Sequence, residues 1–494
     1  MFAQLIRLFK HSIVYGLGAA ASQILSFFLI PMYTRFLNPA DYGILEIFTA
    51  TTSVLYVFAY LGLGVALLRF YPENDNEEKR KELLSTVVIS ITAISFVLSA
   101  VCIAFAQKLS MLIFGSILYA THFRVIFLTM FFDVGVYIAL TAFRAKQKSV
   151  NYVAVTIARI VLVTGLNIFF LGVLHRGVLG ILEASLVTLT LLYLILMIGL
   201  IKEINPRLSI TKLKQMLLFG LPYVPSSIAH WVLALSDRYF LQIFSTSQEL
   251  GLYSLGYKFG VIISSLLVGP FTLVWQPFVA SIVNDKKAKQ IYASVFTYFI
   301  LIAVFIVLVL SLLSKEAIAI MATAPFHDAY EVVPLIALSY LAQGCYFVFE
   351  AGVFLAKKTK YVPVVIGMAA IVKFGLNYLL IPRYGMMGAA TATLISFAIM
   401  PVAMFFISKK FYPISYEFGR VAKIFVVAVP IYIGGILIKN NSLVIEVLLR
   451  MTILAIYPIL LYFFKFYKPQ ELTKVKEICM RILGLIRVWG SKHQ

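Results

Sequence analysis

Fourteen apolar runs, each long enough to cross a membrane as a helix, constrain this chain more than any other feature. About 20 helical residues span a hydrocarbon core of roughly 30 Å. The runs are apolar on every face, whereas strands of a membrane barrel alternate apolar and polar positions. The chain is 62% hydrophobic and 13% charged. These features predict an all-α polytopic membrane protein with 14 transmembrane helices. The expected spans are residues 11–33, 43–68, 84–106, 118–141, 152–173, 178–201, 215–242, 252–281, 291–313, 331–355, 361–381, 386–408, 420–438 and 443–464.

Basic residues gather on alternate sides of these spans. With the N-terminus in the cytoplasm, thirty of the 42 Lys and Arg residues fall in inner segments and seven in outer ones. This is the positive-inside pattern, and it predicts that both termini are cytoplasmic. The net charge of +21 is spread over short loops, so we expect contact with anionic lipid and no nucleic-acid partner.

The sequence repeats itself at offsets of 208 to 211 residues. An even number of helices per copy makes both copies enter the membrane from the same side, which defines a parallel repeat. We therefore expect two six-helix bundles followed by two further helices. The four matches pair FLNPADYG at 36–43 with FSTSQELG at 244–251, FRAKQKSVNYV at 143–153 with FLAKKTKYV at 354–362, GLN at 165–167 with GLN at 375–377, and Gly177 and Gly180 with Gly385 and Gly388.

The repeat divides the chain into four parts. Residues 1–201 form the N-terminal lobe, residues 202–410 the C-terminal lobe, and residues 411–467 carry helices thirteen and fourteen. Residues 468–494 have apolar positions at helical spacing with Lys and Arg between them. That pattern predicts a basic amphipathic helix on the inner leaflet, with a dimerising heptad as the alternative.

Charges inside spans mark candidate sites, because each costs roughly 2.5–3.5 kcal/mol at mid-helix and needs a partner or a water-filled cavity. Four cations come from both lobes, and together they would form a positive pocket suited to a diphosphate. They are Arg159, Arg238, Lys258 and Lys373. In the alternative interpretation, Asp237 neutralises Arg238 and the lysines extend to an interface.

The acids inside and beside spans also leave two interpretations open. Asp133 and Glu183 either bind a coupling cation or neutralise an Arg. Arg35 and Asp41 flank the first outer turn, where they form either a gate or an ordinary loop ion pair. Glu46 and Glu350 are further acids within spans, and Glu446 is expected to pair with Arg450 four residues later on the same helix face.

Transport is expected rather than catalysis. The chain contains no GxxxxGK[ST] motif and no large outer loop that would hold an acceptor for a glycosyltransferase. Its Cys and His residues are scattered, so neither a metal nor a cofactor is expected. Movement would draw on a Na⁺ or H⁺ gradient, the membrane potential or consumption of product. Proline inside a span bends the helix, and Pro222, Pro225, Pro270 and Pro277 predict bends in the seventh and eighth spans.

The residues that carry a family resemblance lie mainly in three segments: PMYTRFLNPADYG at 31–43, RFYPE at 69–73 and GLPYVPSSIAHWVLALSDRYFL at 220–241. Together with the fourteen spans, these resemble the polysaccharide-export flippases. That is the O-antigen (Wzx-type) branch of a superfamily that also holds MATE multidrug exporters and lipid II flippases. The resemblance runs along essentially the whole chain.

The resemblance implies a V-shaped pair of six-helix bundles around a central cationic cavity, in a bacterial inner membrane. It implies that an undecaprenyl-diphosphate-linked oligosaccharide moves from the cytoplasmic to the outer leaflet by alternating access. Arg35 and Asp41 match the Arg and Asp around the first outer turn of lipid II flippases, and Asp237–Arg238 matches an Asp–Arg pair in the seventh helix of the export branch. Helices thirteen and fourteen would shape a groove for the lipid tail. Membrane lipids, a polysaccharide polymerase and chain-length proteins are the implied partners.

Two alternatives share this fold. A cation-coupled multidrug exporter would have acids dominating its cavity, whereas the cations inside these spans favour an anionic cargo. A lipid II flippase would carry a peptidoglycan precursor in place of an export saccharide.

Overall fold

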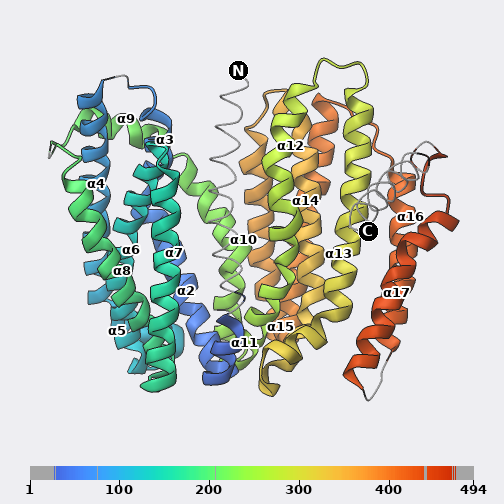
Figure 1. Cartoon of the computed structure of the whole chain (residues 1–494), viewed down its shortest axis with the longest axis horizontal. Helices are drawn as coiled ribbons and strands as arrows, with labels where there is room; N and C mark the ends of the chain where they lie inside the picture. The colour runs from blue at the N-terminus through green and yellow to red at the C-terminus, as the bar shows by residue number, and fades with distance from the viewer. Residues whose placement is uncertain are drawn as a thin grey trace, which may run out of the picture.

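The computed structural model describes residue 27, residues 29–469 apart from 75, 206 and 439–441, and residues 471 and 473. Most of the first predicted span, 11–33, lies outside these residues. So does most of the amphipathic helix predicted at 468–494. The described residues form helices arranged in two bundles that stand side by side (Figure 1).

The N-terminal bundle occupies the left of Figure 1 and begins with a helix whose start the sequence specifies closely. The Asn38 side chain accepts a hydrogen bond from the Asp41 backbone at 2.9 Å, the Asp41 carboxylate accepts one from the Asn38 backbone at 3.4 Å, and Pro39 follows the cap. This is a capping box with proline at the first helical position. The bundle comprises α2 (Pro39–Tyr60), α3 (Leu63–Phe70), α4 (Glu77–Ala104), α5 (Ala106–Phe114), η1 (Ile117–Tyr119), α6 (Ala120–Ala145), α7 (Ser149–Asn167), η2 (Ile168–Val173), α8 (Gly177–Ile201) and α9 (Ile210–Gly220).

The C-terminal bundle is followed by two helices at the right edge of Figure 1, and α17 packs against α13 and α16. Within α15, Gly385 has φ 50° and ψ −130°, so this 51-residue run consists of two helices joined at that residue. Gly177, its predicted repeat counterpart, also has a positive φ of 56°. The bundle comprises α10 (Tyr223–Phe244), α11 (Ser247–Gly260), η3 (Ser264–Val268), α12 (Gly269–Ser281), α13 (Ala288–Met321), η4 (Ala324–Val332), α14 (Val333–Leu355) and α15 (Tyr361–Phe411), and the two further helices are α16 (Phe418–Leu437) and α17 (Leu443–Phe463).

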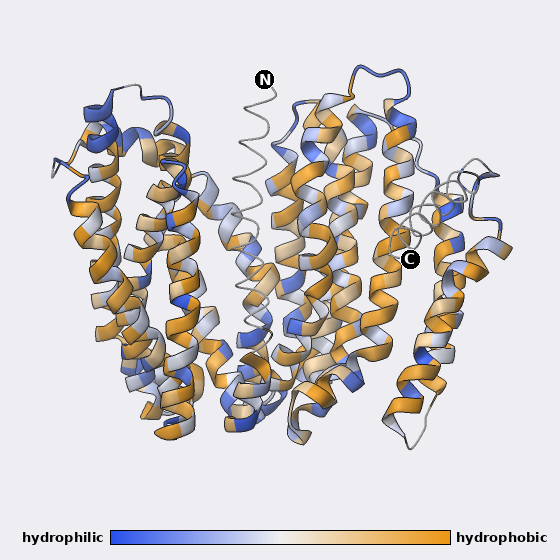
Figure 2. Ribbon diagram, viewed as in Figure 1, coloured by the Kyte–Doolittle hydropathy of each residue, from blue (hydrophilic) through white to orange (hydrophobic). Residues whose placement is uncertain are grey.

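The multi-pass membrane character predicted from the sequence is confirmed. Among the described residues, 11 helices are long and apolar enough to cross a membrane, or 12 when one bent pair is counted as a single span. Hydrophobic residues cover most of the length of these helices, while hydrophilic residues gather at their ends (Figure 2). The count of 14 remains a prediction.

The predicted bend in the seventh span is confirmed. α9 and α10 meet at an angle of 44°, with Leu221 and Pro222 at the break. The eighth span carries a π-helical segment, η3, immediately before Gly269 and Pro270. Because proline cannot donate a backbone hydrogen bond, the regular helical pattern changes at both places.

α9 packs on the N-terminal bundle, against α3 and α4, although α10 belongs to the other bundle. The backbone N–H groups of Asn205 and Ser209 donate to the hydroxyls of Ser85 and Thr86 at 3.0 and 3.1 Å. The Lys212 ammonium lies 2.6 Å from the Glu82 carboxylate. The chain therefore crosses between the bundles at the α9–α10 bend.

The bundles meet at one end, where the first turns of α2 and α11 touch at the lower edge of Figure 1. A Cβ atom placed on Gly43 would lie 2.1 Å from the Ser247 carbonyl oxygen, and one on Gly251 would lie 1.8 Å from the Pro39 carbonyl oxygen. Gly43 and Gly251 are repeat counterparts by sequence. The two repeated turns thus form the closed end of the molecule, which the charge pattern assigns to the outer face.

A hydrophobic core shared by both bundles lies beside this closed end. It brings Tyr42 and Phe48 of α2 together with Leu252 and Leu255 of α11 and Phe326 of η4. Packing of these aromatic and aliphatic side chains adds to the contact between the bundles.

We expect Gly251→Ala to destabilise the closed end, because the added methyl group would overlap a backbone oxygen that cannot move without shifting α2. Overpacking of this kind costs about 1–3 kcal/mol. Gly367→Ala is the matched control, since nothing lies within 4 Å of a Cβ at that position. Thermal unfolding of the purified protein in detergent should show a lower midpoint for Gly251→Ala only. Equal midpoints for the two variants would contradict the close approach.

Candidate functional site

The seam between the bundles is built from α2 on one side and α10 and α11 on the other. Two neutral hydrogen bonds cross it. The hydroxyls of Thr51 and Tyr239 lie 2.6 Å apart, and the Trp231 indole N–H donates to the Ala50 carbonyl oxygen at 3.1 Å. These contacts join α2 to α10 across the seam.

Glu46 of α2 reaches across the seam and is buried, with 6% of its surface exposed. Its Oε1 lies 3.0 Å from Lys258 Nζ, and its Oε2 lies 3.7 Å from Arg238 Nε. Lys258 Nζ also donates to the Tyr42 hydroxyl at 2.7 Å. A carboxylate of the N-terminal bundle is thus neutralised by cations of the C-terminal bundle.

Asp237 of α10 is fully buried and accepts from three side chains. Arg238 Nη1 lies 2.7 Å from its Oδ1, while Lys373 Nζ at 2.9 Å and the Tyr253 hydroxyl at 2.6 Å donate to its Oδ2. Lys373 also donates to the Leu233 carbonyl oxygen. Each charge here has a partner, as a buried ion requires.

These residues form one seam cluster, defined as Glu46, Asp237, Arg238, Lys258 and Lys373. Three cations face two carboxylates, so the cluster carries a net charge of +1. Arg238 lies over the Tyr257 ring at 4.6 Å, which further stabilises a cation away from water. Arg238 and Lys373 are buried, whereas 34% of the Lys258 side chain is exposed. Lys258 is therefore the most exposed cation of the cluster.

A second charged pair lies within the N-terminal bundle. Arg159 Nη1 of α7 is 3.0 Å from Asp133 Oδ1 of α6, and the Tyr56 hydroxyl donates to Asp133 Oδ2 at 2.6 Å. The rings of Tyr56 and Tyr60 stack at 5.6 Å, and those of Tyr60 and Tyr137 at 4.0 Å. With 42% of the Arg159 side chain exposed, this region offers a cation beside a row of aromatic rings.

The structure brings Arg238, Lys258, Lys373 and Asp237 together and places Arg159 with Asp133 elsewhere. Glu183 pairs with Arg176 at 2.9 Å near the start of α8. Asp41 caps α2, and Arg35 is exposed at the end of the helical segment that precedes α2.

Glu46 and Tyr42 are the seam residues whose contacts sequence reasoning did not find. Glu46 is recognisable as an acid inside a span, but its partner Lys258 follows 212 residues later and no spacing rule connects them. The Asp237–Arg238 contact is adjacent in sequence and was among the predicted alternatives.

The predicted Glu446–Arg450 pair is confirmed, and Glu316 of α13 joins it by a further bond to Arg450. This buried group fastens α17 to α13. Glu350 of α14 is half-buried, and it forms no ion pair with any described residue. Within the part of the chain that the structure describes, no group of three or more His, Cys, Asp or Glu residues is arranged to hold a metal ion.

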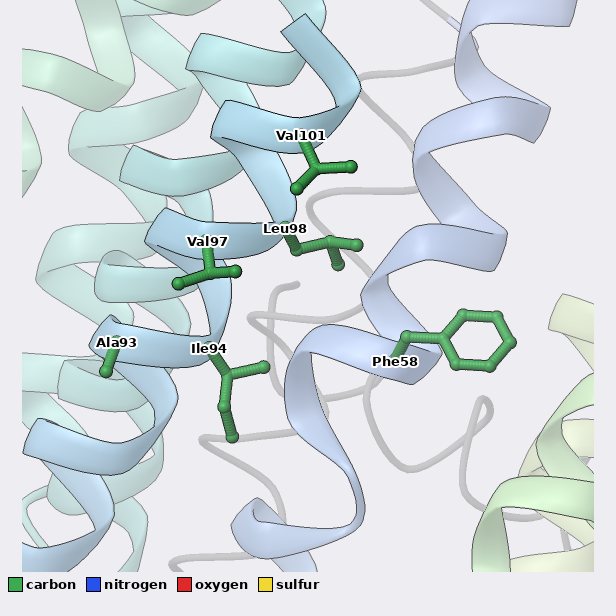
Figure 3. A pocket seen from close by; sticks show the side chains of 6 residues that line it. All are labelled: Phe58, Ala93, Ile94, Val97, Leu98 and Val101. Carbon is green, nitrogen blue, oxygen red and sulfur yellow. The ribbon is translucent and has the colours of Figure 1, made fainter. Parts of the chain in front are cut away.

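Two surface pockets differ in character from the seam. An open groove of about 480 Å³ between α2 and α4 is lined by apolar side chains only, shown in Figure 3: Phe58, Ala93, Ile94, Val97, Leu98 and Val101. A polar pocket of about 340 Å³ at the opposite end from the α2–α11 contact includes Glu203 between Lys146 and Lys148. Burial raises the pKa of Glu203, but hydrogen bonds from the two lysines outweigh it and place that pKa below its ordinary value.

We expect Lys373→Gln to destabilise the protein by about 3–5 kcal/mol, the usual cost of removing one partner from a buried ion pair. Asp237→Asn in the same chain should recover part of that loss, because the carboxylate that has lost one of its two cations is then gone. A double-mutant cycle on thermal unfolding in detergent measures this coupling. Arg69→Gln serves as the control, since its ion pair with Glu73 is exposed. Strictly additive effects of the two seam substitutions would contradict the pairing.

Comparison with solved structures shows the fold. The lipid II flippase MurJ in an inward closed conformation matches with a TM-score of 0.74 and 15% identity, over 91% of this chain and 99% of that one. An inward-facing multidrug resistance MATE family transporter of the MOP superfamily matches with a TM-score of 0.61 and 15% identity, over 78% and 94%. A mutant of the Vibrio cholerae MATE transporter VcmN matches with a TM-score of 0.57 and 16% identity, over 82% and 96%.

These likenesses confirm the MATE-like, lipid II flippase-like fold that the sequence resemblance implied. A search of curated proteins by sequence finds no match. The model of one protein family, described as polysaccharide biosynthesis protein, matches residues 8–283. Because this match covers more than half of the 494 residues, the chain belongs to the polysaccharide biosynthesis protein family.

Proposed function

We propose that this protein is a flippase that turns an undecaprenyl-diphosphate-linked sugar repeat unit from the cytoplasmic to the outer leaflet of a bacterial inner membrane. The observation that carries the proposal is the seam cluster, in which three cations face two carboxylates between the bundles of a transporter fold. A net positive site shielded from water attracts an anionic headgroup.

Moving a lipid-linked sugar diphosphate across a membrane requires a polar site for the headgroup and access to lipid for the tail. A sugar diphosphate cannot cross hydrocarbon unaided, because its charges would lose their hydration. An isoprenoid tail has no such barrier and can remain in lipid throughout. A site with exposed Lys258 at the seam, and Arg159 beside a row of tyrosine rings in the N-terminal bundle, offers contacts for phosphate and for sugar.

Alternating access follows from how the bundles touch. They meet through α2, α10 and α11 at the closed end, which the loop charges assign to the outer face. We infer that this conformation receives cargo from the cytoplasmic side. Rocking about the seam would then open the outer face, with both termini remaining cytoplasmic.

The family's name supports an export saccharide over a drug as cargo, and three of the acids within the spans support it too. Asp133, Glu183 and Asp237 each pair with a cation, whereas a site for a cationic drug needs acids that are available to the drug. Transport is thus the role we assign to the seam, and catalysis is not part of it.

Depleting the protein should make a lipid-linked saccharide accumulate on the cytoplasmic leaflet. Lipid extraction and mass spectrometry of depleted cells would identify it, with re-expression of the wild-type chain as the control. Accumulation of lipid II would establish the peptidoglycan precursor as cargo. Accumulation of no lipid-linked saccharide, together with raised drug sensitivity, would favour the multidrug exporter.

Lys258→Gln should reduce saccharide export by about tenfold or more, since it removes the accessible cation of the seam cluster. Lys286→Gln, a change in an exposed loop, is the matched control and should export normally. Export is measured as surface saccharide per cell at equal protein levels. Undiminished export by Lys258→Gln would remove the phosphate-binding role of the seam.

A further inference from the structure

Glu46 is the residue on which the charge balance of the seam depends. Among the described residues, it makes the ion pairs that join the N-terminal bundle to helices α10–α15. If α2 moves away from α10 and α11, Glu46 leaves and the remaining cluster has three cations and one carboxylate. Its net charge then rises from +1 to +2 in a poorly screened setting. Separation at this end is unfavourable unless another anion replaces Glu46.

The donors around the Glu46 carboxylate are of the kinds that also bind phosphate oxygens. Lys258 Nζ faces one oxygen at 3.0 Å, and the Arg238 side chain faces the other at 3.7 Å. Lys258 also holds the Tyr42 hydroxyl beside the same position. Arginine and lysine together, with a hydroxyl nearby, are a common set for binding phosphate oxygens.

One buried donor of this set is unused. Arg238 is 3% exposed, and its Nε has no hydrogen-bond partner in the described structure. A buried N–H without a partner is costly. Glu46 thus fills this position incompletely, and an anion with more oxygens would satisfy a donor that the carboxylate leaves unpaired.

We propose that Glu46 occupies the place of the cargo's diphosphate, and that diphosphate binding displaces it from Lys258 and Arg238. This rests on the proposed function and adds the coupling step to it. The displaced carboxylate no longer ties α2 to α10 and α11, so the closed end is released only when an anion has arrived. Without cargo, Glu46 keeps that end shut.

The test uses the full-length protein in detergent, with farnesyl diphosphate as the probe and farnesol as the probe without phosphate. Glu46→Gln removes the competing charge, so it should bind farnesyl diphosphate about tenfold or more tightly than wild type. Glu46→Asp keeps the charge and should stay close to wild type. Thr51→Val is the matched control, because it removes a seam hydrogen bond without changing charge.

The second readout is the distance between spin labels on either side of the closed end, at Ile117 and Asp328, both of which are exposed. In wild type, farnesyl diphosphate should lengthen this distance and farnesol should leave it unchanged. In Glu46→Gln, the longer distance should appear without any ligand. If Glu46→Gln does not fold, the spin-label distances of the wild-type protein with farnesyl diphosphate and with farnesol test the proposal.

The proposal is overturned if Glu46→Gln binds the diphosphate no more tightly than wild type, or if farnesyl diphosphate leaves the wild-type distance unchanged. These outcomes are separate from the test of function. A lipid-linked saccharide that accumulates on depletion while Glu46→Gln behaves as wild type would defeat this coupling and preserve the flippase. If no lipid-linked saccharide accumulates on depletion but Glu46→Gln binds the diphosphate more tightly, the diphosphate controls the closed end of a protein that carries another cargo.

Discussion

A charge inside a hydrocarbon layer must find its counter-charge within the protein, and this constraint shapes the seam of the molecule. Arg238, Lys258 and Lys373 neutralise Glu46 and Asp237, and neither lipid nor bulk water can replace those partners at such burial. The same requirement produces the Glu316–Arg450–Glu446 group that fastens α17 to α13. Ionic pairing thereby contributes to which helices stay together.

The two ionic groups differ in what they connect. The group around Arg450 joins helices that belong to the same side of the molecule, so motion between the bundles leaves it intact. The seam cluster joins helices of different bundles through Glu46, and it carries an excess cation. Separating the bundles would break the Glu46 pairs and leave three cations beside one carboxylate, an excess of charge that an anion would offset.

The sequence predicts the membrane-spanning helices well because hydrophobic length is a local property that each helix carries by itself. The bend at Leu221–Pro222, the pairing of Glu446 with Arg450 and the cap at Asn38 all follow from neighbours in the chain. The candidate site could be predicted from the sequence only in part. Asp237 and Arg238 are adjacent, but Lys373 joins them from a helix that begins more than 100 residues later, and Glu46 meets Lys258 across the seam. Such contacts depend on which faces of the helices meet. In spans that are apolar on every side, hydropathy does not indicate which face of a helix points toward which neighbour.

The position of α9 has a mechanical consequence. Lys212 of this helix, with Asn205 and Ser209 just before it, binds α4, while the next helix, α10, supplies Asp237 and Arg238 to the seam. During any rotation of one bundle against the other, α9 must move with the N-terminal bundle and α10 with the C-terminal bundle. The angle between the two helices then has to change at Leu221–Pro222. Arg238 and Asp237 are thus carried by the helix that begins at this break, so a turn there reorients α10 while the far ends of both bundles keep their internal packing.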